Sequence, residues 1–129
     1  MSFPAVSGNQ LYRLVSQVRV PVIVEAWSCG EPASHTQSAV LDELGGVYGD
    51  GVRIARLDVD AYPQTARALG IRRAPTLVIF FQGQELARLE GLTSVTTIET
   101  MLERGLRAQA QRTGRLDAVR AWFRRIMLR

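Results

Sequence analysis

The only cysteine of the chain, Cys29, lies in the segment EAWSCGEPASH, which runs from Glu25 to His35. Thiol–disulfide exchange begins with a thiolate and is completed by a second thiol. One cysteine excludes an internal disulfide and any zinc site built from several cysteines. A nucleophile pair of Cys29 with His35, the only histidine, would need a third group to orient the ring, and none is evident. We therefore interpret His35 as a helix-surface residue and expect neither a metal nor an organic cofactor.

The elements on either side of this segment are a strand and a helix. Val20–Trp27 is a continuous apolar run rich in β-branched residues, which is typical of a strand buried on both faces. A helix is expected to start near Pro32–Ser34 and to run to about Tyr48. Its inward residues are expected to be Val40, Leu41, Leu44 and Val47.

The rest of the pattern predicts an α/β protein. The expected elements are a helix at 7–17, a strand at 52–60, a helix at 61–70, a hairpin at 74–91 that turns at Gln82–Gly83, and a helix at 94–107. This order predicts a central mixed sheet, with a parallel part and an antiparallel edge, covered by helices on both faces.

Charge is unevenly distributed along the 129 residues, whose net charge is +4. Residues 104–129 contain eight arginines and one acid, Asp117. This basic, amphipathic end predicts either an interaction surface or a solvated helix face. We divide the chain into a domain at 1–107 and a C-terminal helical extension at 108–129. The residues of the extension expected to bind a partner are Trp122, Phe123, Arg124 and Arg125.

Several classes of function find no support in the sequence. No nucleic-acid motif accompanies the arginines, so no nucleic acid is expected as a partner. The longest apolar runs are too short to span a bilayer, so no transmembrane segment is expected. The N-terminal residues lack the pattern of a signal peptide, and the expected location is cytoplasmic. The sequence does not predict the oligomeric state.

Residues 3–107 resemble the thioredoxin superfamily in four places. PVIVEAW is similar to the central strand of that family, which ends in an acid and a tryptophan. RIARLDVDAYPQTARALGIRRAPTLVIFFQG is similar to the stretch from the third strand through the cis-proline loop, in which APT at 74–76 holds the proline. LEGL at 89–92 resembles the loop after the hairpin. The resemblance implies a thioredoxin-like fold.

The active-site motif of that family is missing. Thioredoxins carry a Cys-x-x-Cys at the start of the second helix, and counting back from LDEL at 41–44 places its two cysteine positions at Glu31 and Ser34. We interpret Ser34 as a helix-capping residue. A gapped alternative sets CGEP on the motif and makes Cys29 the nucleophile, without a resolving cysteine. The chain is thus predicted to be a redox-degenerate member.

The resemblance implies two further groups of residues. One is a structural, buried ion pair of Glu25 with Arg56, because a buried carboxylate needs a partner. The other is a surface that binds an extended peptide by strand addition. Its residues are Trp27, Arg73, Ala74, Pro75, Thr76, Gly91 and Leu92.

The function expected from these features is protein binding. The extension resembles one tetratricopeptide-like helix pair, as in the chaperedoxins, which join such helices to a thioredoxin domain. We therefore expect a redox-inactive, co-chaperone-like module in protein folding or redox homeostasis, with client proteins as partners. The alternative is a monothiol thiol–disulfide oxidoreductase that uses Cys29 as its catalytic residue.

Overall fold

The structure, a computed structural model, describes residues 7–114, 119–122 and 124. Its elements are α1 (Gly8–Gln17), β1 (Val22–Trp27), α2 (Pro32–Tyr48), the short 3-10 helix η1 (Gly49–Gly51), β2 (Arg53–Asp58), α3 (Pro63–Ala68), β3 (Thr76–Phe81), β4 (Gln84–Glu90) and α4 (Val95–Thr113). The predicted α/β class and mixed sheet are confirmed.

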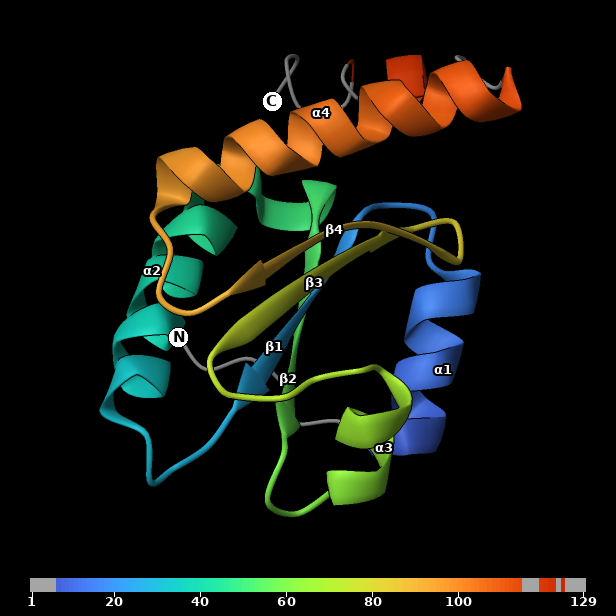
Figure 1. Ribbon diagram of the computed structural model, residues 1–129. Coiled ribbons are helices and arrows are strands. Elements are labelled where there is room, and N and C mark those ends of the chain that lie inside the picture. Colours follow the sequence, from blue (N-terminus) through green and yellow to red (C-terminus); the bar gives the residue numbers. More distant parts are fainter. Residues whose placement is uncertain (1–6, 115–118, 123, 125–129) are drawn as a thin grey trace.

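The four strands form one sheet in the order β2-β1-β3-β4 (Figure 1). β1 pairs with β2 in parallel and with β3 in antiparallel fashion, and β3 and β4 form a hairpin. The hairpin turn is Gln82–Gly83, and both residues have positive φ angles, 52° and 80°. A two-residue turn of this hand matches the twist of the two strands that it joins.

The alternation of side chains along the central strands divides the core into two layers. On β1, Ile23 packs in a cluster with residues of α2 and α4, while Val22 and Val24 pack in a second cluster with residues of α1 and α3. On β3, Ile79 belongs to the first cluster and Phe80 to the second. Because successive strand residues point to opposite faces, a continuous apolar run requires helices on both faces.

The inward face of α2 differs in one place from the prediction. Leu41 and Leu44 are fully buried, but Val47 is 62% exposed. The buried positions follow the spacing Gln37, Leu41, Leu44, and Tyr48 continues that face and packs against the core. Val47 lies about 100° around the helix from Tyr48, so it points away from the core.

α4 runs beyond residue 107 and ends at Thr113, where Gly114 adopts a left-handed conformation with φ 69°. Its later turns still pack on the sheet, because Ala110 is buried and the Gln109 side chain donates a hydrogen bond to the carbonyl of Phe81 at 2.9 Å. The end of the predicted domain at 107 therefore falls inside a helix, and the division at this residue stays a proposal.

Part of the C-terminal extension packs on the domain. Trp122 is 5% exposed, donates a hydrogen bond from Nε1 to the carbonyl of Gly51 at 2.6 Å, and stacks on Tyr48 with ring centroids 6.2 Å apart. Its indole therefore packs on the domain, and the binding of a partner by the extension stays a prediction. Arg124 is exposed, whereas Phe123 and Arg125 lie outside the described residues.

Among the helices of the described residues, none combines the length and the apolar character that crossing a membrane requires.

We expect Trp122→Ala to lower the free energy of unfolding by about 3 kcal/mol, because it removes a large buried side chain together with its hydrogen bond. Urea unfolding followed by circular dichroism measures the change. Arg120→Ala, at an exposed position of the same segment, is the control and should change stability by less than about 0.5 kcal/mol. Equal stability of the two variants would contradict the packing of Trp122.

Candidate active site

The turn that leads from β1 into α2 carries the only cysteine. Cys29 is a free, exposed cysteine. The turn is closed by a hydrogen bond from the Glu31 amide to the Ser28 carbonyl at 3.1 Å. α2 then begins at Pro32, which suits the first helical position because it has no amide hydrogen to satisfy. The thiol therefore stands just before the N-terminus of α2.

Ser34 is a fully buried residue of the first turn of α2. Its hydroxyl accepts a hydrogen bond from the Ser28 amide at 3.2 Å. The N-cap of the helix is Glu31, which has the extended backbone that a cap requires and makes no side-chain capping bond. The interpretation of Ser34 as the cap is therefore wrong, because Ser34 lies inside the helix and holds the preceding turn instead.

His35 contacts the same turn from the exposed side of α2. Its Nε2 lies 3.1 Å from the carbonyl oxygen of Cys29, and its ring meets the Trp27 ring edge-on, with centroids 5.3 Å apart. The contact is to the backbone of Cys29. His35 is thus exposed, as the sequence suggested, but it also helps to hold the turn in place.

A buried polar cluster lies beneath Trp27, between β1, β2 and α2. Glu25 and Arg56 are paired residues of the β1–β2 ladder, and Arg56 Nε lies 3.3 Å from Oε1 of Glu25. The Ser38 hydroxyl of α2 donates to the same oxygen at 2.6 Å and accepts from Nη2 of Arg56 at 2.8 Å. The guanidinium group of Arg56 also lies over the Trp27 ring, 4.9 Å from its centroid.

The carboxyl group of Glu25 is incompletely satisfied by this cluster. The side chain is fully buried, and Oε2 has no hydrogen-bond partner among the described residues. Burial raises the pKa of Glu25 above its ordinary value of 4.5, and the charge of Asp42 acts in the same direction. The hydrogen bond from Ser38 and the charge of Arg56 oppose the rise. The ionised form of Glu25 is therefore less favoured in the folded protein than in the unfolded chain.

The loop before β3 brings the other predicted site residues to the same edge of the sheet. The Ala74–Pro75 peptide bond is cis, and the Thr76 hydroxyl donates to the Arg73 carbonyl at 2.7 Å. Thr76 pairs with Ala26, so Pro75 lies beside the end of β1 that leads to the cysteine turn.

The loop after β4 lies against this cis-proline loop. The Gly91 amide donates to the Pro75 carbonyl at 2.8 Å. Leu92, the next residue, is 54% exposed. The cis-proline loop and residues 91–92 thus lie next to the end of β1 that holds Trp27, and the binding of a peptide there stays a prediction.

Gln37 positions this second loop, and our sequence reasoning missed it. Its buried side chain accepts a hydrogen bond from the Thr93 amide at 2.8 Å and donates one to the Thr93 carbonyl at 3.2 Å. The available signal was a polar residue at helical spacing with Leu41 and Leu44 on the inward face of α2. Asp60 was also missed, and it accepts a hydrogen bond from the Ser28 hydroxyl at 2.7 Å.

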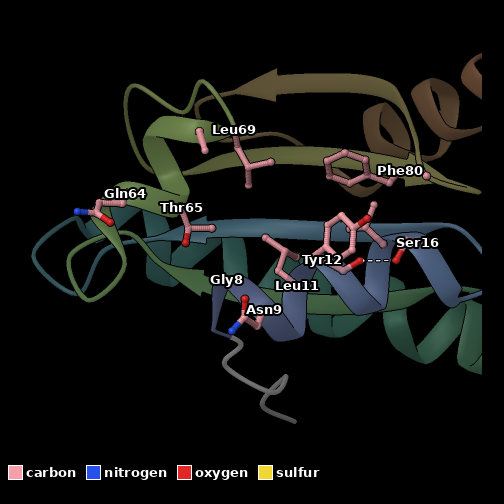
Figure 2. Close-up of a pocket in the computed structure, with 12 residues that line it drawn as sticks. Gly8, Asn9, Leu11, Tyr12, Ser16, Gln64, Thr65, Leu69 and Phe80 are labelled. Atoms are coloured by element: carbon pink, nitrogen blue, oxygen red, sulfur yellow. Dashed lines mark hydrogen bonds between the residues drawn. The ribbon is translucent and has the colours of Figure 1, made fainter.

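A separate cavity of about 650 Å³ lies between α1 and α3 on the other face of the sheet (Figure 2). Leu11, Tyr12, Leu69 and Phe80 give it an apolar lining, and Thr65 and Gln64 add polar groups from α3. The sequence singled out none of these residues as functional. The cavity is distinct from the cysteine turn, because no residue of that turn lines it.

Comparisons with known proteins agree with the fold. The sequence profile of the family described as Thioredoxin matches residues 5–104. A thioredoxin of Synechocystis sp. is 34% identical over 105 residues, which cover 80% of this chain and 96% of that protein. Thioredoxin 1 of Nostoc sp. is 35% identical over 89 residues, or 67% of this chain and 81% of that protein. This chain therefore belongs to the thioredoxin family.

Solved structures support the same fold. Chloroplastic thioredoxin z superposes with a TM-score of 0.73 at 20% identity, over 81% of this chain and 95% of that chain. A mutant thioredoxin from Halobacterium salinarum superposes with a TM-score of 0.71 at 24% identity, over 79% of this chain and 88% of that chain.

These relatives correct the function expected from the sequence. We expected a redox-inactive, co-chaperone-like module, because the Cys-x-x-Cys is missing. The curated relatives are named thioredoxins, which are thiol–disulfide oxidoreductases, and they cover most of the chain. The prediction of a co-chaperone is therefore wrong.

We compare the free energy of unfolding of the wild type with that of Glu25→Gln. As the pH rises from 4.5 through the raised pKa of Glu25, the wild type should become less stable relative to the variant. The folded state binds this proton more tightly than the unfolded state. The stability that the carboxyl group contributes is therefore fully present below pH 4.5 and is lost as the pH rises through the folded pKa. Each unit of pKa rise corresponds to about 1.4 kcal/mol.

Urea unfolding of both proteins from pH 4 to 8 measures this difference. Glu43→Gln, at an exposed position on the same helix, is the control, and its difference from the wild type should stay within about 0.5 kcal/mol throughout. A difference between the wild type and Glu25→Gln that does not vary with pH would contradict the expectation.

Proposed function

We propose that this protein performs thiol–disulfide exchange with a single thiol, that of Cys29, and that a second thiol from outside the chain completes the reaction. The observation that carries the proposal is the exposure of this free thiol at the start of α2 in a member of the thioredoxin family. The chain has no other cysteine, so it supplies no resolving thiol itself.

The proposed chemistry has two exchange steps. The thiolate of Cys29 attacks one sulfur of a target disulfide, forms a mixed disulfide with it, and releases the other sulfur as a thiolate, which takes up a proton. A second thiolate from solution then attacks the target sulfur of the mixed disulfide. It becomes joined to the target, and Cys29 leaves as a thiolate.

Target proteins would bind at the edge of the sheet beside this thiol. The surface that we propose for an extended target segment consists of Trp27, Arg73, Ala74, Pro75, Thr76, Gly91 and Leu92. Its support is the hydrogen bond from Gly91 to Pro75 and the pairing of Thr76 with Ala26, which hold both loops next to the end of β1. An extended segment laid beside the cis-proline loop would gain main-chain hydrogen bonds with that loop.

We also propose that Glu31 and Ser34 occupy the two positions of a lost dithiol motif. The Ser34 amide bonds to the Glu31 carbonyl at 3.0 Å, so the two residues lie one helical turn apart. Side chains three residues apart on a helix are neighbours. The spacing therefore suits a disulfide, although neither residue can form one.

The C-terminal extension and the location of the protein remain proposals. We propose that the extension resembles a tetratricopeptide-like helix pair. A single pair of this kind cannot bury its apolar face by itself and needs another surface to pack on. The burial of Val119 and Trp122 in the core of the domain supports this proposal. The expected cytoplasmic location would suit the proposed chemistry, since the cytoplasm is a reducing compartment that supplies small thiols.

We expect native Cys29 to form a mixed disulfide with a protein disulfide substrate at least about tenfold faster than the same cysteine in a peptide of residues 25–35. The surface beside Pro75 holds the target disulfide near the thiol, and such positioning raises the rate. Quenched-flow alkylation and intact-mass spectrometry measure the modified fraction.

The control for this measurement is Cys29→Ser, which should accumulate no mixed disulfide. Equal rates for the native protein and the peptide would mean that Cys29 is an ordinary exposed thiol, and the proposed function would then be wrong.

We expect Glu31→Cys combined with Ser34→Cys, in the Cys29→Ser background, to give an intramolecular disulfide and measurable reduction of insulin. Two cysteines one helical turn apart are within the Cα separation of about 4.4–6.8 Å that a disulfide requires. Alkylation before and after reduction counts the bonded thiols. Each single replacement is the control, and failure of the double variant to form the bond would contradict the proposed register.

A further inference from the structure

The cavity between α1 and α3, which we call the α1–α3 cavity, has the size and the lining of a small-molecule site. Its volume of about 650 Å³ is within the range of such sites. Figure 2 shows Leu11 and Tyr12 of α1 on one side of it and Leu69 and Phe80 on the other. Leu11 and Phe80 are 3% and 8% exposed, so the inner part of the cavity is withdrawn from solvent. The cavity thus offers a ligand apolar surface on two sides.

Two aromatic side chains contribute to this lining. Phe80 lies in the buried core layer between the sheet and the helices α1 and α3. Tyr12 lines the same cavity, but it is 74% exposed, which is unusual for a large aromatic residue next to apolar surface. Aromatic rings bind one another in offset-stacked or edge-on arrangements. A ligand that contains a flat ring would therefore gain contacts with both side chains.

No charged side chain lines the α1–α3 cavity. Among the described residues that line it, none is acidic, and none is an arginine or a histidine. A charged ligand would lose its hydration there without gaining an ion pair, and such a loss is costly. The lining therefore favours a ligand that carries no charge.

Thr65 provides a polar group at the end of the cavity away from Tyr12 and Phe80 (Figure 2). Its Oγ1 atom would be 2.7 Å from a Cβ atom placed on Gly8, so the missing side chain at residue 8 leaves room for the hydroxyl group. Thr65 is half-buried, and its hydroxyl makes no hydrogen bond with another residue in the described part of the chain. A hydroxyl group that is partly removed from water is stabilised by a partner. A ligand in the cavity can supply that partner.

We propose that the α1–α3 cavity binds a small, uncharged aromatic molecule that has one hydrogen-bonding group. The ring of the ligand contacts Tyr12 and Phe80, and its polar group bonds to the hydroxyl of Thr65. The proposal goes beyond the proposed function and does not depend on it, because no residue of the cysteine turn lines the cavity. The probe is 1-naphthol, which has two fused rings and one hydroxyl group and is uncharged near neutral pH.

Nuclear magnetic resonance titration of the full chain with 1-naphthol measures the dissociation constant and locates the site. We expect saturable shifts of the amide signals of Leu11, Tyr12 and Leu69. Ala68 is an exposed residue that lines the cavity, so Ala68→Phe places a ring where the ligand would lie. This variant should weaken binding by at least about tenfold. The control is Ala39→Phe, at an exposed position of α2 on the other face of the sheet, which should bind as the wild type does.

A second variant tests the polar contact and does not depend on the folding of Ala68→Phe. Thr65→Val keeps the shape of the side chain and removes the hydroxyl group. It should weaken the binding of 1-naphthol by about fivefold and leave the binding of naphthalene, which has no polar group, unchanged. Thr36→Val, at an exposed position of α2, is the matched control and should change neither. The anion 1-naphthoate should bind the wild type at least about tenfold more weakly than 1-naphthol.

Three outcomes would overturn the proposal. Equal weakening by Ala68→Phe and Ala39→Phe would mean that the probe adheres elsewhere on the surface. Binding of 1-naphthoate as tight as that of 1-naphthol would contradict an uncharged ligand. Shifts of the lining amides with protein concentration alone would mean that a second copy of the chain occupies the cavity. Cys29→Ser should bind 1-naphthol as the wild type does, so the failure of either proposal is visible without the other.

Discussion

The burial of β1 on both faces is the constraint on which the rest of the structure depends. Ile23 points into one core layer and its neighbours Val22 and Val24 point into the other, so neither face of the strand can be left to solvent. Helices α2 and α4 cover one face, and α1 and α3 cover the other. The strand ends at Trp27, and the turn that must return the chain to α2 carries the thiol. The position of the only thiol thus follows from the packing of one strand.

An ionisable group inside such a core needs polar partners. Glu25 lies between apolar residues of β1, and the pairing of β1 with β2 sets Arg56 opposite it. Ser38 from α2 bridges the two side chains. Replacing one member of a buried cluster leaves the others without compensation, whereas the whole cluster contributes little net stability. We therefore regard it as a device that fixes α2 relative to the sheet, and with it the cysteine turn.

The sequence predicted those features that depend on local pattern. The apolar run of β1 required two helical layers, and the turn was predicted at residues 82–83, where the structure has it. The prediction of the inward face of α2 was wrong at its last turn. Tyr48 packs on the core there, and the adjacent Val47, which was expected to do so, is exposed. It also missed contacts between distant segments, such as those of Gln37 with Thr93 and of Trp122 with η1. Such contacts depend on tertiary distances that no spacing within a helix specifies.

In a dithiol protein, the same two cysteines would both fix the turn and perform thiol exchange. In this chain, which has one cysteine, we assign these two roles to different residues. Ser34 has the structural role, because its buried hydroxyl accepts a hydrogen bond from the Ser28 amide and so fixes the turn. Cys29 is the residue to which our proposal assigns the chemical task, because it is exposed and its carbonyl is held by His35. A lone thiol has no intramolecular competitor, so a mixed disulfide persists until an outside thiol arrives. The lifetime of such an intermediate would then depend on how well the surface beside Cys29 receives the second thiol.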